Sequence, residues 1–367
     1  MLILGMILVG IASFVLFIFL KKRRRDIKLP PAAWNTPLIG CLPVVVSKNV
    51  AEEMFKIGKQ LGPVVSTHLG FKKLVIVNGP EAIKEAFRNS SIAGRADVLY
   101  KQFLGGKGLI WPDDVKDIRK FIFKCSRHFE FTGNATESII HEQITLLLKD
   151  FEKHNGEYFR VNKTFNIPMV NAIFNLLLGA KIPHDDPDFQ YVVKRINMIA
   201  TLPDPFMRAC VLYPPLLKWV PTFLSGEEKA KGYFNDGLSL VQKYLDILLA
   251  TRVPNQPRCF ADALQDKIDE TTNETSVFHF EQKSDTTIIF DILVAAIDST
   301  ASTLEWIVLY LSQLPQIQKK VQAEIDKIFD ILPEKKLNNF GGSMAITWHC
   351  VDFKAKFVPR IQNRERT

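Results

Sequence analysis

The residues best suited to chemistry lie in one short run, AAIDSTAST, from Ala295 to Thr303. It places a carboxylate, Asp298, directly before a hydroxyl, Ser299. An acid beside hydroxyl groups can relay protons to a reacting centre. The small residues Ala295 and Ala296 would leave room for a bulky group against the chain. The alternative, close packing of helices with hydroxyls bonded back to their own helix, remains open.

One long element must position this run. Ser284 to Leu314 contains no Pro or Gly between its ends, which predicts a helix of about 43 Å. Ser284-Asp285 offers N-cap oxygens, and Pro315 sets the end. Its apolar residues cover nearly the whole circumference, which predicts a buried helix. Three acids spaced by seven, at 291, 298 and 305, form a single stripe along it.

The run resembles the central helix of the cytochrome P450 monooxygenases, whose pattern is Ala/Gly-Gly-x-Asp/Glu-Thr-Thr/Ser. Ala295 and Asp298 fit, Ala296 replaces the usual Gly, and Ser299 replaces the usual oxygen-activating Thr. The resemblance implies that this helix crosses a haem. It implies catalytic, proton-relaying roles for Asp298 and Ser299, and cofactor-binding roles for Ala295 and Ala296. A serine keeps the hydroxyl but lacks the methyl that restricts its rotamer, so altered proton delivery is expected.

A second candidate is Arg119, in the segment Gly108 to Phe129, whose apolar stripe from Val115 to Phe129 predicts a helix. It falls on the Arg of the family's Trp-x-x-x-Arg pair, which implies contact with a haem propionate. Val115 occupies the Trp position, and Trp111 lies one turn earlier. The basic face of this helix suits an acidic redox partner, with a plain solvated face as the alternative.

The predicted fold is mainly α with a small β-hairpin over Pro63 to Val77, an incomplete P450 fold plus one N-terminal transmembrane helix. Residues 1–20 are apolar and precede the basic cluster KKRRR, which predicts a signal anchor with the remainder cytosolic. Residues 21–43 form a basic flank and Pro-rich hinge, 44–328 the incomplete catalytic domain, and 329–367 an atypical tail. By resemblance to microsomal members, we expect the endoplasmic reticulum membrane.

The charge distribution and the cysteines limit the kinds of function and the cellular compartment that fit this sequence. Five of the net +8 charges come from residues 21–25, which excludes a nucleic-acid footprint. The five cysteines are scattered without a CxxC pair, as in reduced cytosolic proteins.

Asp188 to Leu224 is predicted to be a lid whose Pro-rich apolar end contacts membrane or ligand. PRCFADALQDKID, from Pro257 to Asp269, resembles a segment of the animal family-2 clan.

The resemblance ends near Ile328. The family's Glu-x-x-Arg helix and its Phe-x-x-Gly-x-Arg-x-Cys-x-Gly segment, which supplies the thiolate ligand of haem iron, do not follow. The flanks of Cys350 do not fit that segment, and His349-Cys350 is interpreted as an incidental pair, so no metal ligand is assigned. The chain therefore resembles a C-terminally truncated member.

Three functional hypotheses follow. An intact member would be a haem-thiolate monooxygenase that oxidises apolar organic substrates with O2 and electrons from an NADPH-dependent flavoprotein reductase. A protein with this sequence is predicted to lack monooxygenase activity. The alternatives are a non-catalytic, membrane-anchored protein that binds ligand or reductase without haem, and a polypeptide that does not fold stably.

Overall fold

The structure is a computed structural model that describes residues 29–33, 40–47, 49–129, 131, 133–201, 205–325, 329–333, 342–344, 348–350 and 354–359. The described chain is mainly helical with small antiparallel sheets, which confirms the mainly α part of the predicted fold class. It divides into two compact units, Met1–Ala93 and Gly94–Thr367. The predicted membrane anchor, residues 1–20, lies outside the described residues.

The N-terminal unit is built on the predicted hairpin. It contains α2 (Leu42–Val45), α3 (Val50–Leu61), β1 (Val64–Leu69), β2 (Lys72–Val77), α4 (Pro80–Arg88) and η1 (Ser90–Ile92). β1 and β2 pair antiparallel around a turn at Gly70, whose φ is +58°. A positive φ is readily adopted by glycine. Residues of β1 from Val65 to Leu69 are all buried, rather than alternately buried as in a half-solvated strand.

Residues 30–33, predicted as part of a hinge, explain this burial because they run along β1. The Ser66 amide donates to the carbonyl of Pro31 at 2.8 Å, and the Ala33 amide donates to the Ser66 carbonyl at 2.9 Å. The Cys41 amide donates to the carbonyl of His68 at 2.7 Å. His68 is buried within β1, where it pairs with Lys73 of β2.

The C-terminal unit carries the remaining elements. They are α5 (Leu99–Phe103), α6 (Lys116–His128), α7 (Asn134–Glu152), β3 (Phe159–Arg160), α8 (Asn166–Leu178), α9 (Pro187–Thr201), α10 (Pro205–Leu212), η2 (Pro214–Lys218), α11 (Thr222–Ser225), α12 (Glu227–Leu249), α13 (Phe260–Asp269), η3 (Phe280–Gln282), α14 (Asp285–Gln313), α15 (Pro315–Ile325), β4 (Phe329–Pro333), β5 (Gly342–Met344), β6 (Trp348–Cys350) and β7 (Lys354–Pro359). β7 pairs with both β3 and β4, and β5 pairs with β6. Strands β4 to β7 thus lie in the region predicted as an atypical tail.

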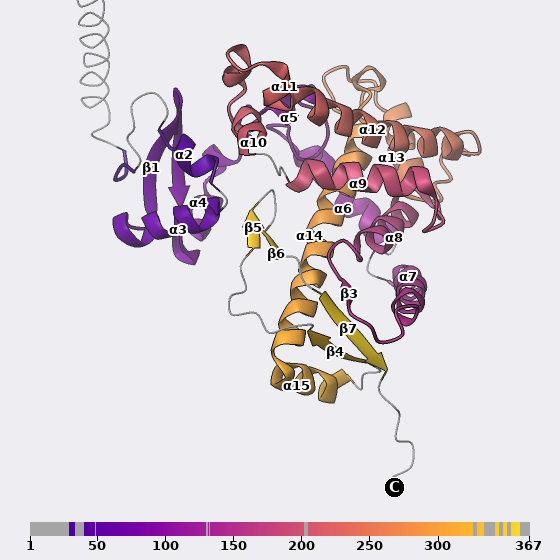
Figure 1. Cartoon of the computed structure of the whole chain (residues 1–367). Helices are drawn as coiled ribbons and strands as arrows, with labels where there is room; N and C mark the ends of the chain where they lie inside the picture. The colour runs from indigo at the N-terminus through magenta and orange to yellow at the C-terminus, as the bar shows by residue number, and fades with distance from the viewer. Residues whose placement is uncertain are drawn as a thin grey trace, which may run out of the picture. The chain divides into compact units, whose positions relative to one another are not determined.

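The long helix α14 organises the C-terminal unit, as Figure 1 shows. It packs against α8, α9, α12 and α13, and its buried side includes Phe290, Leu293 and Ile297. Among the described residues it is the one helix long and apolar enough to cross a membrane. Half of its apolar window is buried within the unit, which is typical of a core helix.

The two ends of α14 are set differently. Pro315 follows the helix as predicted, and the Leu314 amide still bonds to the Tyr310 carbonyl. Ser284 is the N-cap residue as predicted, but its hydroxyl makes no capping hydrogen bond and instead donates to the Val277 carbonyl at 2.5 Å. This contact ties the preceding loop to the first turn of α14.

All four cysteines whose environment is described are buried free thiols. Cys41 lies in the N-terminal unit, and Cys125, Cys210 and Cys259 lie in the C-terminal unit. Burial raises the pKa of the Cys125 thiol to about 11, and it also raises the pKa of Cys41 and of Cys259. These three thiols therefore stay protonated near neutral pH.

Candidate functional site

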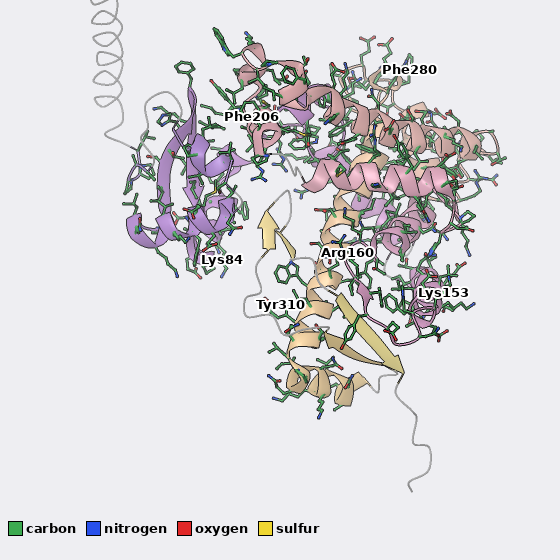
Figure 2. The ribbon with its side chains drawn as sticks, in the orientation of Figure 1. Lys84, Lys153, Arg160, Phe206, Phe280 and Tyr310 are labelled. Carbon is green, nitrogen blue, oxygen red and sulfur yellow. The ribbon has the colours of Figure 1, made fainter. Side chains whose placement is uncertain are left out.

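The middle of α14 is open on one side, although the sequence predicted a helix buried all round. Ala295, Ser299 and Thr303 are exposed, each four residues after the last, and Ala296 beside them is half-buried. Residues four apart lie on one helix face. Ile307 and Tyr310 (Figure 2) continue the exposed side toward the end of the helix. We call Ala295, Ser299 and Thr303 the open face.

Hydroxyls on the open face bond back to their own helix, as one sequence interpretation anticipated. Ser299 Oγ donates to the Ala295 carbonyl and Thr303 Oγ1 donates to the Ser299 carbonyl, both at 2.7 Å. Each hydroxyl uses its proton in this bond, but its oxygen keeps lone pairs that can accept. In the part of the chain that the structure describes, no helix packs closely over Ser299 and Thr303, because both side chains are exposed.

Asp298 lies away from the open face. It is 7% exposed, whereas the adjacent Ser299 is exposed. Successive helical residues point in different directions, so the structure separates the predicted acid–hydroxyl pair between the packed side and the open side of α14. Of the two predicted catalytic residues, Ser299 is the one that a molecule on the open face can contact directly.

The carboxylate stripe of α14 is buried along its length. Asp291 and Glu305 are 1% and 5% exposed. Asp291 Oδ2 accepts hydrogen bonds from the amides of Leu109, at 2.6 Å, and Ile110, at 2.8 Å. Glu305 Oε1 accepts from the Lys163 amide at 2.5 Å. The first and last acids of the stripe therefore hold loop backbone against the helix.

Sequence reasoning missed this role of Asp291. The signal was a carboxylate in an apolar helix that had no cationic partner at helical spacing. Burial raises the pKa of Asp291 to about 6, although the two amide hydrogen bonds lower it. An acid held this way must satisfy its oxygens with backbone donors.

The loop that docks on Asp291 is also held from its other side. Arg95 Nε donates to the Ile110 carbonyl at 2.9 Å, and the Arg95 amide donates to Asp113 at 3.0 Å. Lys101 Nζ lies 2.9 Å from the other carboxylate oxygen of Asp113. Hydrogen bonds from Lys101 and from the Arg95 amide lower the pKa of Asp113. Arg95 thus fixes the loop before α6.

Arg119 lies early in α6, which begins at Lys116, directly after Val115, the first residue of the predicted apolar stripe. Its side chain is exposed, and among the residues that the structure describes it makes no ion pair. Phe121 of the same helix packs against Phe260 and Phe278, with ring centroids 5.8 and 5.4 Å apart. Arg119 is therefore held on an anchored helix and is available to an anionic group.

Trp111, considered as a substitute for the missing family tryptophan, packs into the protein instead. Its ring meets the Tyr100 ring edge to face, with centroids 5.9 Å apart. Tyr100 is buried, and its hydroxyl donates to the Ile199 carbonyl at 3.2 Å. Trp111 thus anchors the loop before α6 to the core.

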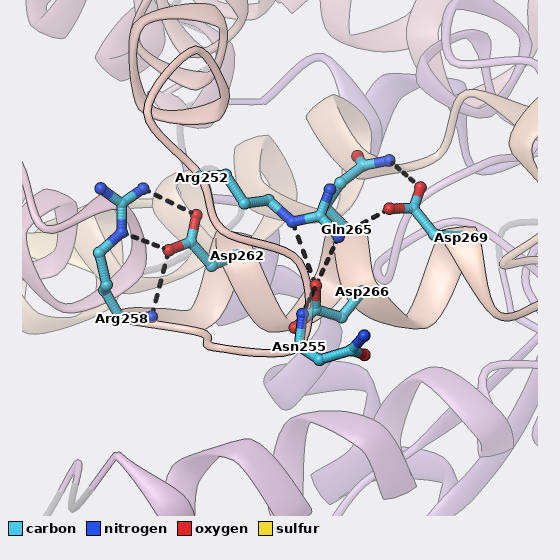
Figure 3. Close-up of polar contacts among 7 residues, drawn as sticks. All are labelled: Arg252, Asn255, Arg258, Asp262, Gln265, Asp266 and Asp269. Carbon is cyan, nitrogen blue, oxygen red and sulfur yellow. Dashed lines mark hydrogen bonds and ion pairs between the residues drawn. The ribbon is translucent and has the colours of Figure 1, made fainter.

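The segment Pro257–Asp269 forms an ion-pair network rather than a reactive site, as Figure 3 shows. Arg258 binds both carboxylate oxygens of the fully buried Asp262, at 2.7 and 3.2 Å. Arg252, just after α12, contacts Asp266 at 2.5 Å and Asp269 at 2.6 Å. Figure 3 shows these contacts joining the loop after α12 to α13. The network therefore fixes a connection between two helices.

Comparison with known proteins assigns the family. The sequence model described as Cytochrome P450 matches residues 30–336, most of the chain. The chain belongs to the cytochrome P450 family. It is similar to "Cytochrome P450 2C16" of Oryctolagus cuniculus, with 24% identity over 88% of the chain. It is 28% identical over 88% of its length to "Cytochrome P450 2J2" of Homo sapiens, and 27% identical over 82% to "Cytochrome P450 2F5" of Gorilla gorilla gorilla. The resemblance to the family-2 clan is thereby confirmed.

The match is shorter than the relatives themselves. It covers 66% of the rabbit protein, 64% of the human protein and 62% of the gorilla protein. The chain thus spans less than two thirds of the length of these curated relatives.

The P450 family implies haem, and the open face fits a flat group of that kind. Ala295, Ser299 and Thr303 have small side chains on three successive turns, so a planar molecule could approach the α14 backbone closely. Ser299 supplies an acceptor oxygen at this surface. Arg119 supplies an exposed guanidinium suited to a carboxylate.

Proposed function

We propose that this P450 chain carries the distal part of a haem monooxygenase that acts on apolar organic substrates. The observation that carries the proposal is the open face of α14 at the position of the family's oxygen-binding run. When bound, haem supplies the iron centre at which O2 is activated for insertion of one oxygen atom into the substrate.

The chain's own residues would act around that group as follows. Ala295 and Ala296 leave space beside the helix for oxygen and substrate. Ser299 Oγ accepts a hydrogen bond from a protonated group on the open face while its own hydroxyl proton remains hydrogen-bonded to the Ala295 carbonyl. Arg119 binds a propionate. Asp298 completes proton delivery only if a water chain joins it to the open face, because its carboxyl lies on the packed side.

The proposed partners are a membrane and an NADPH-dependent flavoprotein reductase. Support for the reductase is the basic face of α6, where five cationic side chains are exposed: Lys116, Arg119, Lys120, Lys124 and Arg127. Opposite charge steers such encounters. Support for the membrane is the segment 211–224, which exposes Trp219 and Phe223. We place the protein, by resemblance, on the cytosolic side of the endoplasmic reticulum membrane, held by residues 1–20.

A second candidate is a protein that keeps the scaffold and binds ligand or reductase without haem. It is favoured by the sequence around Cys350, which carries Ser343, Ile346 and Asp352 where the family's axial segment has Phe, Gly and Gly. In the proposal, the proximal cysteine segment is therefore lacking from this chain.

The test is the visible spectrum of the full chain expressed with haem supply, reduced and treated with carbon monoxide. A chain with the distal site alone is expected to bind haem weakly and to give no thiolate-type band. Arg119→Gln should weaken hemin affinity further, by about tenfold for one lost charge-assisted contact, whereas Lys124→Gln on the same helix should not.

Two results would change the proposal. A thiolate-type band that disappears in Cys350→Ser would assign the axial role to Cys350, and the chain would be a complete monooxygenase site. Absence of any saturable hemin binding, with the folded helical content intact, would favour the second candidate.

A further inference from the structure

The stretch of backbone that connects the two compact units is exposed along its whole length. It runs from Phe87, near the end of α4, to Asp97, and every residue in it is exposed. Its regular structure after α4 is the single turn η1. That turn is held by local bonds, in which the Ile92 amide donates to the Asn89 carbonyl and the Ala93 amide to the Ser90 carbonyl. A turn held only by exposed local bonds opens at little cost in free energy.

Ser91, within η1, has a charged neighbour at a spacing that enzymes can recognise. Arg88 stands three residues before it, and the apolar Ile92 follows it directly. Ser91 is the one serine in the whole sequence that has an arginine three residues before it. Protein kinases that select basic substrates bind such an arginine with acidic side chains, so the recognition is electrostatic.

The structure presents this pattern to solvent. Arg88 is the last residue of α4, and in the part of the chain that the structure describes it makes no ion pair. Asn89 after it has extended backbone, with φ −91° and ψ 110°. The Ser91 amide donates to Asn89 Oδ1 at 2.9 Å, a bond between two exposed residues. The segment can therefore enter the groove of another protein once one short turn has opened.

A similar pattern elsewhere in the chain lacks this access. Thr286 has a cation, Lys283, three residues before it. Thr286 is buried, and its hydroxyl donates to Gln242 Oε1 at 2.5 Å across the contact between α14 and α12. Exposure therefore separates Ser91 from Thr286 in the folded protein.

We propose that Ser91 is a phosphorylation site for a basophilic serine kinase, with Arg88 as the recognition residue. ATP is the co-reactant. Ser91 Oγ attacks the γ-phosphorus, the new Oγ–P bond forms, and the bond between that phosphorus and the departing oxygen of ADP breaks. The hydroxyl proton passes to the kinase and then to solvent. The site does not involve the open face of α14 and does not rest on the proposed function.

Phosphorylation reverses the charge of the connection. Arg88, Arg95 and Asp97 are its charged residues, so its formal charge is +1. A phosphate on Ser91 adds about two negative charges at pH 7. The modification therefore changes the electrostatics of the backbone segment that joins the two units.

The experiment treats the folded, haem-free full chain in detergent with ATP labelled at its γ-phosphate. The enzyme is a purified serine kinase that requires arginine three residues before the acceptor. Label should be found on Ser91 by peptide mass spectrometry, and Ser91→Ala should remove it. Arg88→Gln should lower kcat/KM for phosphorylation about tenfold or more, because a charge-assisted contact with the kinase is lost.

Two matched controls separate recognition from general loss of charge or of a hydroxyl. Lys84→Gln removes an exposed cation one turn earlier on α4 (Figure 2), and kcat/KM should stay unchanged. Ser90→Ala removes the neighbouring hydroxyl and should leave the label on Ser91.

Three results would overturn the proposal. One is label at other residues, including Thr367 after Arg364, with Ser91 unmodified. Another is an equal effect of Arg88→Gln and Lys84→Gln. The third is label on Ser91 only after the chain has been unfolded in urea, since the folded protein would then not present the site. Because haem is absent throughout, failure to bind hemin would overturn the proposed function and leave this result standing.

Discussion

The Ser299 hydroxyl donates a hydrogen bond to the Ala295 carbonyl, and its oxygen lies on the open face of α14. If Cys350 supplies the axial thiolate and the site is complete, Ser299→Ala should lower product formation with an apolar substrate about tenfold or more, because an acceptor for proton delivery is lost. Ser299→Thr should keep or raise activity, since the added methyl restricts the hydroxyl rotamer. The measurement is product formed per electron consumed in the presence of reductase.

Thr303→Ala is the control for this series, because Thr303 makes the same back-bond one turn later. If Thr303→Ala and Ser299→Ala have equal effects, the loss comes from the helix and not from a hydroxyl at one position.

The second prediction at the scale of residues is that Asp291 makes the free energy of unfolding depend on pH. Its pKa is about 6 in the folded protein, above the ordinary value of 3.8, because burial disfavours the charge. Between these values the folded state binds more protons than the unfolded state. The free energy of unfolding contributed by this group therefore falls as pH rises from about 4 to 6, by about 3 kcal/mol. Urea unfolding across this range should show the slope in the wild type.

Asp291→Asn should flatten that component of the pH dependence while leaving the rest of the profile in place. The informative quantity is the free energy of unfolding of the wild type minus that of the Asp291→Asn variant. If this difference rises with pH, rather than falls, it would contradict the folded pKa and its cause.

At the scale of elements, the Arg258–Asp262 pair joins the connection after α12 to α13. Arg258→Ala should lower the free energy of unfolding, because it leaves a buried carboxylate without its partner. Replacing both residues, Arg258→Met with Asp262→Leu, should cost less than Arg258→Ala alone. A double-mutant cycle in urea measures the coupling, and additive effects would show that the pair is not coupled.

This pair also has a pH sign opposite to that of Asp291. Burial raises the pKa of Asp262, but hydrogen bonds from Arg258 outweigh it and lower the pKa below 3.8 overall. The contribution is present above the unfolded value and is lost as pH falls through the folded pKa. The Arg258→Ala penalty should therefore shrink in strong acid.

Elements bounded by local signals could be predicted from sequence. α14 begins and ends within one residue of the predicted Ser284 to Leu314, because a polar start and Pro315 bound a long helical pattern. The segment before α6 gave no sign in its sequence that Asp291 and Arg95 hold it as a loop. The contact with Asp291 joins positions nearly 200 residues apart, and no local periodicity contains it. For the same reason the run at Ala295 was found, but its open side and the burial of Asp298 were not.

At the scale of the whole molecule, the segment from Val211 to Leu224 is expected to contact the bilayer. Trp219 and Phe223 are 86% and 79% exposed. Exposure of these apolar side chains to water is unfavourable, and insertion into a membrane removes that free-energy penalty. In the full chain bound to phosphatidylcholine vesicles, nitroxide-labelled lipid should quench tryptophan emission. Trp219→Phe should reduce the quenched fraction, whereas Trp111→Phe, which removes a half-buried ring, should not. Equal quenching in wild type and Trp219→Phe would contradict the contact.

The four buried thiols allow the opening of each unit to be measured separately. A buried, protonated thiol reacts with an alkylating reagent only after the surrounding structure opens. Cys41 reports on the N-terminal unit, and Cys125, Cys210 and Cys259 report on the C-terminal unit. Pulse alkylation followed by peptide mass analysis can therefore give separate opening rates for the two units of one unlabelled chain, and will show whether either unit unfolds before the other.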